Sequence, residues 1–495
     1  MNRGGHDMEL TKQWLEHFKQ LRTFDEAISL LYWDMRTQMP EQSAPLRAET
    51  IGYLSTEAFK RQTSESFKRL LDEMEGADGL TPIESRSLSV AKTQYERNAK
   101  IPPEEYQAYV TLVSEAETAW EKAKERDDWG MFAPYLEKIV AYQRKFADYF
   151  GYASHPYDAL LYDFEPGMTV AQLDRLFEGL RDELVPLIRQ LKQVGAPLDW
   201  SMDQKAQERI CHDWMRVVDY DLSRGRLDAT VHPFEITINR RDVRITTKYD
   251  EADYRNALFG TMHEAGHATY EQQIDAALDE LGLGGGASMG IHESQSLFFE
   301  NFVGRSVAFL KSVYPSLQAE HPPLSSIDFE TFYAGVNEAK PSLIRIEADE
   351  LTYSLHIIIR YELEKALIQG TLSVAELPAA WNRLYKEYLG VDVPSDAKGV
   401  LQDVHWAGGS FGYFPSYALG LVYAAQLTET LRAQHPELDT WIASGEFGPI
   451  KQWLETNVHR HGKSLTPNEL IREVTGEDIS VRPLVRYLTA KYGTA

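Results

Sequence analysis

Residues 263–267 read His-Glu-Ala-Gly-His and place two imidazoles four positions apart, with a carboxylate directly after the first. On an α-helix, positions i and i+4 share one face, so both rings can bind one metal ion. Glu264 would lie beside this pair, where it can reach a water on the metal. The pattern therefore predicts two metal ligands, His263 and His267, and a general base, Glu264, within one helical turn. The alternative, an exposed helix that carries two histidines by chance, is disfavoured by the surrounding sequence.

The third metal ligand must come from elsewhere, because a catalytic zinc usually has three protein ligands and one open position. Glu293 is the preferred candidate, since it opens the next predicted helix, which continues with apolar residues that can pack on the core. Glu300 is the rival, deeper in the same helix. His292 fits better as a hydrogen-bonding partner behind the site than as a ligand. Zinc is the expected ion, and Co²⁺ or Mn²⁺ could replace it in such a site.

An arginine flanked by isoleucines, Arg345, has two interpretations. It forms a buried structural ion pair, with Glu347 or Asp349 as its partner, or its planar fork binds the carboxylate of a ligand. The residues alone leave both open.

Clustered glycines between residues 399 and 412 leave room for a ligand beside several polar side chains. His405 and a tyrosine of this segment, Tyr413 or Tyr417, are suitable hydrogen-bond donors to the oxyanion of a tetrahedral intermediate.

The HExxH segment has a helical setting. Asp250 and Glu251 put acid at its start, and apolar residues recur from Tyr254 onward at helical spacing. Gly266 is the weak point, because glycine costs about 1 kcal/mol in a helix interior. A glycine also lets another backbone or a substrate come close.

The elements before this helix are of two kinds. The first 220 residues are mostly helical in pattern, with a long helix expected over 10–37 and a helix start at Pro102-Pro103. Between 230 and 248, β-branched residues alternate around a polar turn at 239–242. This predicts a small antiparallel hairpin just before the metal helix, whose edge can hold an extended peptide. The glycine-rich stretch 281–290 follows no strand, so it is a loop and not a nucleotide-binding turn.

Composition narrows the class of protein. A net charge of −24 argues against nucleic acid as a partner, since phosphate binding needs basic patches. The one cysteine, Cys211, excludes an intramolecular disulfide and a cysteine zinc site, which fits a reducing cytoplasm. No run of 18 apolar residues occurs, and the N-terminus lacks an apolar signal region, so we expect a cytoplasmic protein without a membrane span.

Together these segments resemble the carboxypeptidase Taq family of metallocarboxypeptidases, of the thermostable carboxypeptidase 1 type. The matching pieces come in the family's order, and they are His232-Pro233-Phe234, Asp242-Val243-Arg244-Ile245-Thr246, the HExxH at 263–267, His292-Glu293-Ser294-Gln295, Ile344-Arg345 through Asp349, and Gly399 through Trp406.

The resemblance covers essentially the whole chain and implies a mainly α-helical fold with a deep central groove and a small antiparallel sheet beside the HExxH helix. Residues 1–495 would form one peptidase domain, with a helical N-terminal part over about 1–225 and a catalytic part over about 226–495. The resemblance also implies His263, His267 and Glu293 as zinc ligands, Glu264 as the base, and a homodimer. Its members release single C-terminal residues from peptides with broad specificity, acting poorly on proline.

The segment from His405 also resembles thimet-type oligopeptidases, in which a histidine precedes Ala-Gly-Gly and a catalytic tyrosine follows. That register favours Tyr417 over Tyr413 as the oxyanion donor, with His405 beside it.

We expect Arg345 to bind the free C-terminal carboxylate of the substrate by charge-assisted hydrogen bonds. The remaining polar motif residues are expected to shape the groove, namely His232, Asp242, Arg244, Gln402 and Asp403. An alternative for the Asp242 and Arg244 pair is that it staples the hairpin.

Two other functions compete with a carboxypeptidase. An endo-acting oligopeptidase would use the same metal chemistry but tolerate an amidated C-terminus. A chaperone or scaffold would keep only a structural zinc, which normally has four protein ligands. The intact Glu264 and the three-ligand site argue against the latter.

Overall fold

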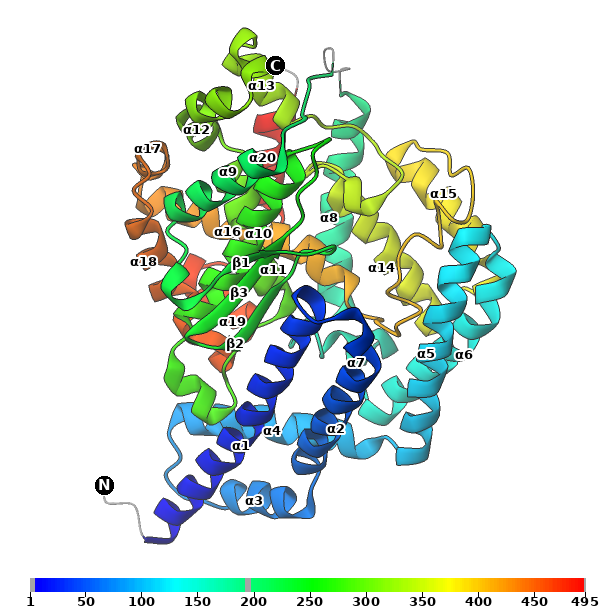
Figure 1. Ribbon diagram of the computed structural model, residues 1–495. Coiled ribbons are helices and arrows are strands. Elements are labelled where there is room, and N and C mark those ends of the chain that lie inside the picture. The colour runs from blue at the N-terminus through cyan, green and yellow to red at the C-terminus, as the bar shows by residue number, and fades with distance from the viewer. Residues whose placement is uncertain (1–4, 192–196, 494–495) are drawn as a thin grey trace.

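The computed structural model describes residues 5–191 and 197–493, and it is predominantly helical, with one small sheet near its centre (Figure 1). This confirms the predicted fold class. The first part of the chain consists of α1 (Gly5–Thr37), α2 (Ala44–Gln62), α3 (Glu65–Glu75), α4 (Pro82–Lys100), α5 (Pro103–Arg126), α6 (Trp129–Phe150), α7 (Pro156–Leu161), α8 (Val170–Arg189) and α9 (Gln204–Val217).

Local sequence signals set these helix ends. Thr81 caps α4, and the side chain of Glu84 accepts a hydrogen bond from the Thr81 backbone N–H, which completes a capping box. Pro103 is the first residue of α5, where its missing N–H costs nothing, as the sequence predicts. Short 3₁₀ segments lie between the longer elements, and they are η1 (Glu41–Ser43), η2 (Leu222–Arg224), η3 (Ala276–Leu281), η5 (Pro322–Ser326), η6 (Arg345–Glu347), η7 (Val374–Glu376) and η8 (His459–Ser464).

The sheet has three strands in the order β1-β3-β2, and they are β1 (Leu227–Ala229), β2 (Glu235–Asn239) and β3 (Asp242–Thr247). β2 and β3 pair antiparallel, which confirms the predicted hairpin, and β1 adds a parallel strand that the alternation did not indicate. The sheet is therefore mixed. β2 lies at its edge.

The second part of the chain is helical again. It consists of α10 (Arg255–Gln273), α11 (Met289–Leu297), the π-helical segment η4 (Phe298–Gly304), α12 (Val307–Glu320), α13 (Phe329–Val336), α14 (Tyr353–Gln369), α15 (Leu377–Leu389), α16 (Phe414–Gln434), α17 (Leu438–Ser444), α18 (Gly448–Asn457), α19 (Pro467–Thr475) and α20 (Arg482–Tyr492). The HExxH helix α10 begins at Arg255, so the expected start at Asp250 and Glu251 was wrong. Asp250 and Asp253 instead form turns whose carboxylates accept backbone N–H groups before the helix.

Buried apolar side chains form two clusters. The large cluster runs from α5 to α20 and includes the inner faces of α10, α11 and α16. A separate small cluster joins α1, α3 and α4, with Trp14 and Met74 among its most buried side chains. In Figure 1, α1 runs obliquely past the sheet beside β2, so this helix faces the strand edge.

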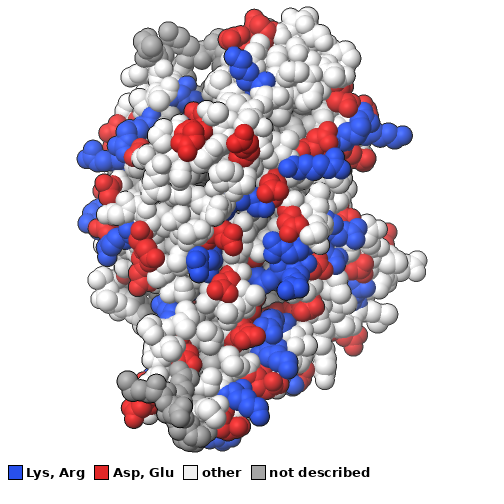
Figure 2. All heavy atoms as spheres, turned by 90° about the vertical axis from the view of Figure 1, so that its left-hand side faces the viewer, with Lys and Arg blue, Asp and Glu red and all other residues white. Residues whose placement is uncertain are grey.

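The surface carries charges of both signs. On the face drawn in Figure 2, acidic and basic side chains are interspersed without a broad patch of one sign. Within the described residues, no helix is long and apolar enough to cross a membrane.

Candidate active site

Three side chains from two adjacent helices converge at the centre of the molecule. His263 and His267 lie one turn apart on α10, and Glu293 reaches them from α11. The Glu293 Oε2 atom lies 3.7 Å from His263 Nε2 and 3.4 Å from His267 Nε2. One ligand atom from each residue fits within 4.8 Å of the others, so the three could hold one metal ion.

The far side of each imidazole is already occupied. Nδ1 of His263 lies 2.7 Å from Glu300 Oε2, and Nδ1 of His267 lies 2.6 Å from His292 Nδ1. These contacts fix both rings so that Nε2 faces Glu293. Glu300, the rival third ligand, thus lies behind His263, and His292 lies behind His267.

The chain of contacts behind His267 continues outward. His292 Nε2 lies 2.7 Å from Glu271, which is ion-paired with Arg240, and Arg240 also binds Asp279 at 3.0 Å. The sequence interpretation missed Glu271, although it stands four residues after His267 on the same helix face, a spacing that could have identified it.

Electrostatics at the centre favour a bound cation. Burial lowers the pKa of His267 to about 4, which keeps the ring neutral, as metal ligation requires. At His263 burial acts in the same direction, but the carboxylates of Glu293 and Glu300 outweigh it and raise the pKa to about 10. Burial opposes ionisation of Glu293, yet the two histidines hold its pKa near 2. The donor atoms and the surplus of carboxylates therefore fit a divalent metal.

Glu264 is 9% exposed and lies in a cavity of about 620 Å³ together with His267 and Glu293. Burial raises its pKa to about 7, so the carboxylate can exchange a proton near neutral pH. A general base in a cavity beside a metal site is the arrangement that hydrolysis by activated water needs.

A glycine brings the two ligand helices together. A Cβ atom on Gly266 would lie 2.4 Å from the Gln295 backbone oxygen and 2.6 Å from Ser296 Cα. The expected close approach of another backbone at Gly266 is therefore confirmed, and that backbone belongs to α11. Gly420 of α16 plays a similar part on the other side, because its Cβ would lie 2.6 Å from Glu293 Cγ.

Two tyrosines of α16 and the preceding turn, Tyr413 and Tyr417, line the same cavity. The Tyr417 hydroxyl lies 3.1 Å from His405 Nε2, and burial lowers the pKa of His405 to about 4. A neutral imidazole thus adjoins the phenol. Burial also raises the pKa of Tyr417, so its hydroxyl keeps a proton to donate.

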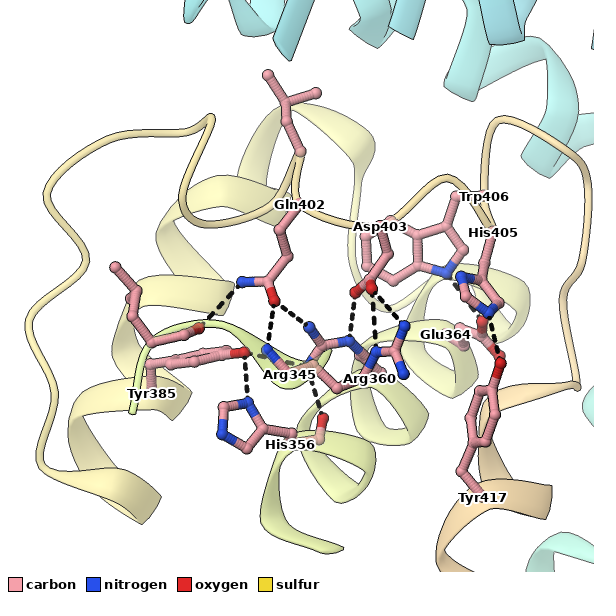
Figure 3. A network of polar contacts seen from close by, with 12 residues as sticks. Arg345, His356, Arg360, Glu364, Tyr385, Gln402, Asp403, His405, Trp406 and Tyr417 are labelled. Carbon is pink, nitrogen blue, oxygen red and sulfur yellow. Dashed lines mark hydrogen bonds and ion pairs between the residues drawn. The ribbon is translucent and has the colours of Figure 1, made fainter. Parts of the chain in front are cut away.

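Arg345 belongs to a buried network that Figure 3 shows in detail. Its Nε and Nη2 atoms lie 3.0 Å and 2.9 Å from one oxygen of Asp403, and Arg360 Nε lies 2.6 Å from the other. Gln402 accepts hydrogen bonds from the Arg345 backbone N–H and from Arg360 Nη2. Although burial acts in the opposite direction, Arg360 and Arg345 hold the pKa of Asp403 below its ordinary value.

In the alternative interpretation of Arg345 as a structural ion pair, the partners considered, Glu347 and Asp349, were wrong. Glu347 is exposed and Asp349 accepts backbone N–H groups of its own loop, whereas Asp403 lies 58 positions away in sequence, beyond the reach of a local pattern. Tyr353 was missed, and its hydroxyl accepts a hydrogen bond of 3.2 Å from Arg345 Nη1.

The polar residues of the hairpin make contacts of their own, separate from those of the metal centre. Asp242 and Arg244 form a two-point ion pair with each other at 2.7 Å, and the Arg244 guanidinium lies 4.5 Å from the ring of Trp33. His232 is exposed.

Comparison with known proteins identifies the family of this chain. Residues 13–492 match the family model of the carboxypeptidase Taq (M32) metallopeptidases. Carboxypeptidase 1 of Bacillus subtilis (strain 168) is 50% identical over 488 residues, covering 97% of each chain. Thermostable carboxypeptidase 1 of Thermus thermophilus is 40% identical over 482 residues, covering 94% of each chain.

A solved structure shows the same fold. The M32 carboxypeptidase from Deinococcus radiodurans R1 superimposes with a TM-score of 0.95 at 39% identity, covering 98% of this chain and 99% of the other. Over nearly its whole length, therefore, this chain belongs to the carboxypeptidase Taq (M32) family, and it is a metallocarboxypeptidase that acts on peptides.

Proposed function

We propose that this enzyme uses zinc to release single C-terminal residues from peptides with broad specificity, and that it acts poorly on proline. The observation that carries the proposal is the convergence of His263, His267 and Glu293, of which His267 and Glu293 line one cavity with Glu264. When bound, zinc supplies Lewis acidity that lowers the pKa of a water toward 7 and polarises the scissile carbonyl.

The side chains supply the proton transfers and the charge stabilisation. Glu264 takes the proton of the attacking water and delivers it to the leaving amine, for which a pKa of about 7 is suited. Tyr417 donates its hydroxyl hydrogen to the oxyanion, and His405 orients that hydroxyl from 3.1 Å. Tyr413 remains the alternative donor, because it lines the same cavity.

Recognition of the C-terminal carboxylate falls to Arg345. A guanidinium has five N–H groups, and Asp403 and Tyr353 take three of them here, which leaves two for a substrate. The Arg345 guanidinium also lies 5.1 Å from the Tyr417 ring, beside the oxyanion donor.

The other polar motif residues act indirectly. Gln402 and Asp403 hold Arg345 in place, whereas Asp242 and Arg244 pair with each other along β3. His232 is exposed three residues before β2 begins, and we expect it to shape the groove from there. Because both Asp242 and Arg244 lie on β3, their ion pair does not link β2 to β3, and the Arg244 guanidinium instead contacts the Trp33 ring of α1.

A mixed peptide library, incubated with the zinc-loaded enzyme and read by mass spectrometry, tests the function. We expect ladders shortened one residue at a time from the C-terminus, stalled before proline, and abolished by a chelator. Internal cleavage, or equal hydrolysis of free and amidated C-termini, would support an endo-acting oligopeptidase instead. Reloading the chelated enzyme with Zn²⁺, Co²⁺ or Mn²⁺ identifies the preferred ion.

We also propose a homodimer in the cytoplasm, from the family resemblance and from the single buried cysteine, Cys211. Light scattering on the purified enzyme measures its oligomeric state.

A further inference from the structure

The cavity at the metal centre continues into a second one. The second cavity, of about 570 Å³, shares lining residues with the first, and they are Val90, Gln94, Glu271, Gly285 and Lys463. A single cleft therefore runs from Glu264 to the inner side of α1 and α4.

The edge strand β2 follows this cleft along its length. Phe234 and Glu235 line the first cavity, and residues 237–239 line the second. Because a strand rises about 3.3 Å per residue, Glu235 and Asn239 stand about 13 Å apart. A peptide laid along this edge, with its scissile bond beside Glu264, places residues three to five positions upstream in the second cavity.

The two cavities differ in their balance of charge. Carboxylates predominate around the metal centre, among them Glu235 and Glu293, whereas in the second cavity Arg22, Arg240 and Lys463 balance Asp25, Glu271 and Asp279. Among residues 5–191 and 197–493, neither Arg22 nor Lys463 has a carboxylate within ion-pair distance. Arg240 lies in the same cavity but is already paired with Glu271 and Asp279.

Lys463 stands at the junction of the two cavities. A Cβ atom on Gly285 would lie 3.6 Å from Lys463 Nζ, so the amine lies over the glycine-rich loop, facing the cleft. Its backbone oxygen accepts a hydrogen bond from Arg86, another cation of the cleft wall, which lines the first cavity. Asp25 is a carboxylate of the second cavity. Burial raises the pKa of Asp25, and Lys463 acts against that rise.

We propose that the second cavity is a cationic subsite, in which Lys463 and Arg22 bind carboxylate side chains of the substrate three to five residues upstream of the scissile bond. The inference rests on the proposed C-terminal cleavage, which sets the direction of the peptide. It makes the enzyme, despite its net charge of −24, prefer peptides with acidic residues at these positions.

The test uses one neutral peptide with Glu, Gln or Lys at the fourth position upstream of the cleaved bond. We expect the wild-type kcat/KM to be about 3- to 5-fold higher for Glu than for Gln, the scale of a partly exposed ion pair, and to fall further for Lys. Lys463→Gln and Arg22→Gln should each lower the Glu/Gln ratio, and the double variant should bring it to about one. Asp25→Asn should raise it, because it removes the competing carboxylate.

Lys311→Gln is the matched control, since Lys311 is exposed on α12 and lines neither cavity. It should leave the ratio unchanged. A Glu/Gln ratio that survives the double variant overturns the subsite. So does a double variant that changes only the preference for free over amidated C-termini, because the cations then bind the C-terminus. Failure of the proposed function would appear differently, as no release of the C-terminal residue even from the Gln peptide.

Discussion

The catalytic role of Glu264 can be tested separately from metal binding. Glu264→Gln preserves the size of the side chain but cannot accept a proton from water. We expect full zinc content, measured by metal analysis, and a loss of at least about 10³-fold in kcat. Substantial turnover with full metal content would show that another group is the base.

Glu293 and Glu300 can be distinguished by metal affinity. Glu293→Ala removes a proposed ligand and should abolish stable metal binding without unfolding the protein. Glu300→Ala removes only the partner of His263 Nδ1, which lies 2.7 Å away, so we expect a smaller loss of about 10- to 100-fold. Competition with a zinc indicator measures both constants, and a metal-poor Glu300 variant beside a metal-replete Glu293 variant would reverse the assignment.

Arg345→Ala should mainly harm recognition of the free C-terminus. Asp403 keeps its bond of 2.6 Å to Arg360, so we expect the fold to survive. Loss of charge-assisted hydrogen bonds in a partly desolvated groove should cost about 2–4 kcal/mol of transition-state binding. The quantity to measure is the ratio of kcat/KM for one peptide in its acid and amide forms. An unchanged ratio in a folded, active variant would mean that another cation binds the C-terminal carboxylate.

At the scale of elements, the pairing of α10 with α11 depends on Gly266. Ala has the higher helix propensity, but at this position its methyl group would meet backbone atoms of α11 that cannot move aside easily. We therefore expect Gly266→Ala to lower the unfolding free energy by about 1–3 kcal/mol. It should also weaken metal binding, because it displaces Glu293 from His263 and His267.

Gly260 provides the control in the same helix. A Cβ atom there would meet nothing within 4 Å, so Gly260→Ala should stabilise the protein by up to about 1 kcal/mol. Thermal unfolding of both variants, each with and without zinc, checks the pair. Equal effects of the two substitutions would mean that helix propensity, and not the approach of α11, decides both.

These elements also show what a sequence can predict. The spacing of His263 and His267 places both rings on one face because the helix period is local, and the alternation before it predicts the hairpin for the same reason. The partners considered for Arg345 as a structural ion pair were wrong, because Asp403 reaches it only through the packing of distant segments. The parallel strand β1 is three residues long, too short for alternation to show.

The whole molecule has two apolar cores of unequal size, and the smaller one supports a wall of the cleft. The small core joins α1, α3 and α4, which supply one wall of the second cavity through Arg22 and Val90. Trp14, 1% exposed, is among its most buried side chains and donates a hydrogen bond of 2.9 Å to Ser87. A unit with fewer buried contacts opens at a lower free energy than the main core.

Native-state hydrogen exchange should therefore show α1 and α3 opening before α10, α11 and α16. We expect their most protected amides to exchange at least about tenfold faster than those around the metal centre. Trp14→Ala should widen this difference, since truncating a buried tryptophan costs about 3–5 kcal/mol, and should leave exchange in α10 and zinc affinity unchanged. Equal protection throughout, or loss of protection in α10 on Trp14→Ala, would show that the two cores unfold as one.

Under the expected behaviour, the wall of the cleft formed by the N-terminal helices moves while the metal centre stays fixed, which lets a long peptide reach β2 without disturbing the ligands.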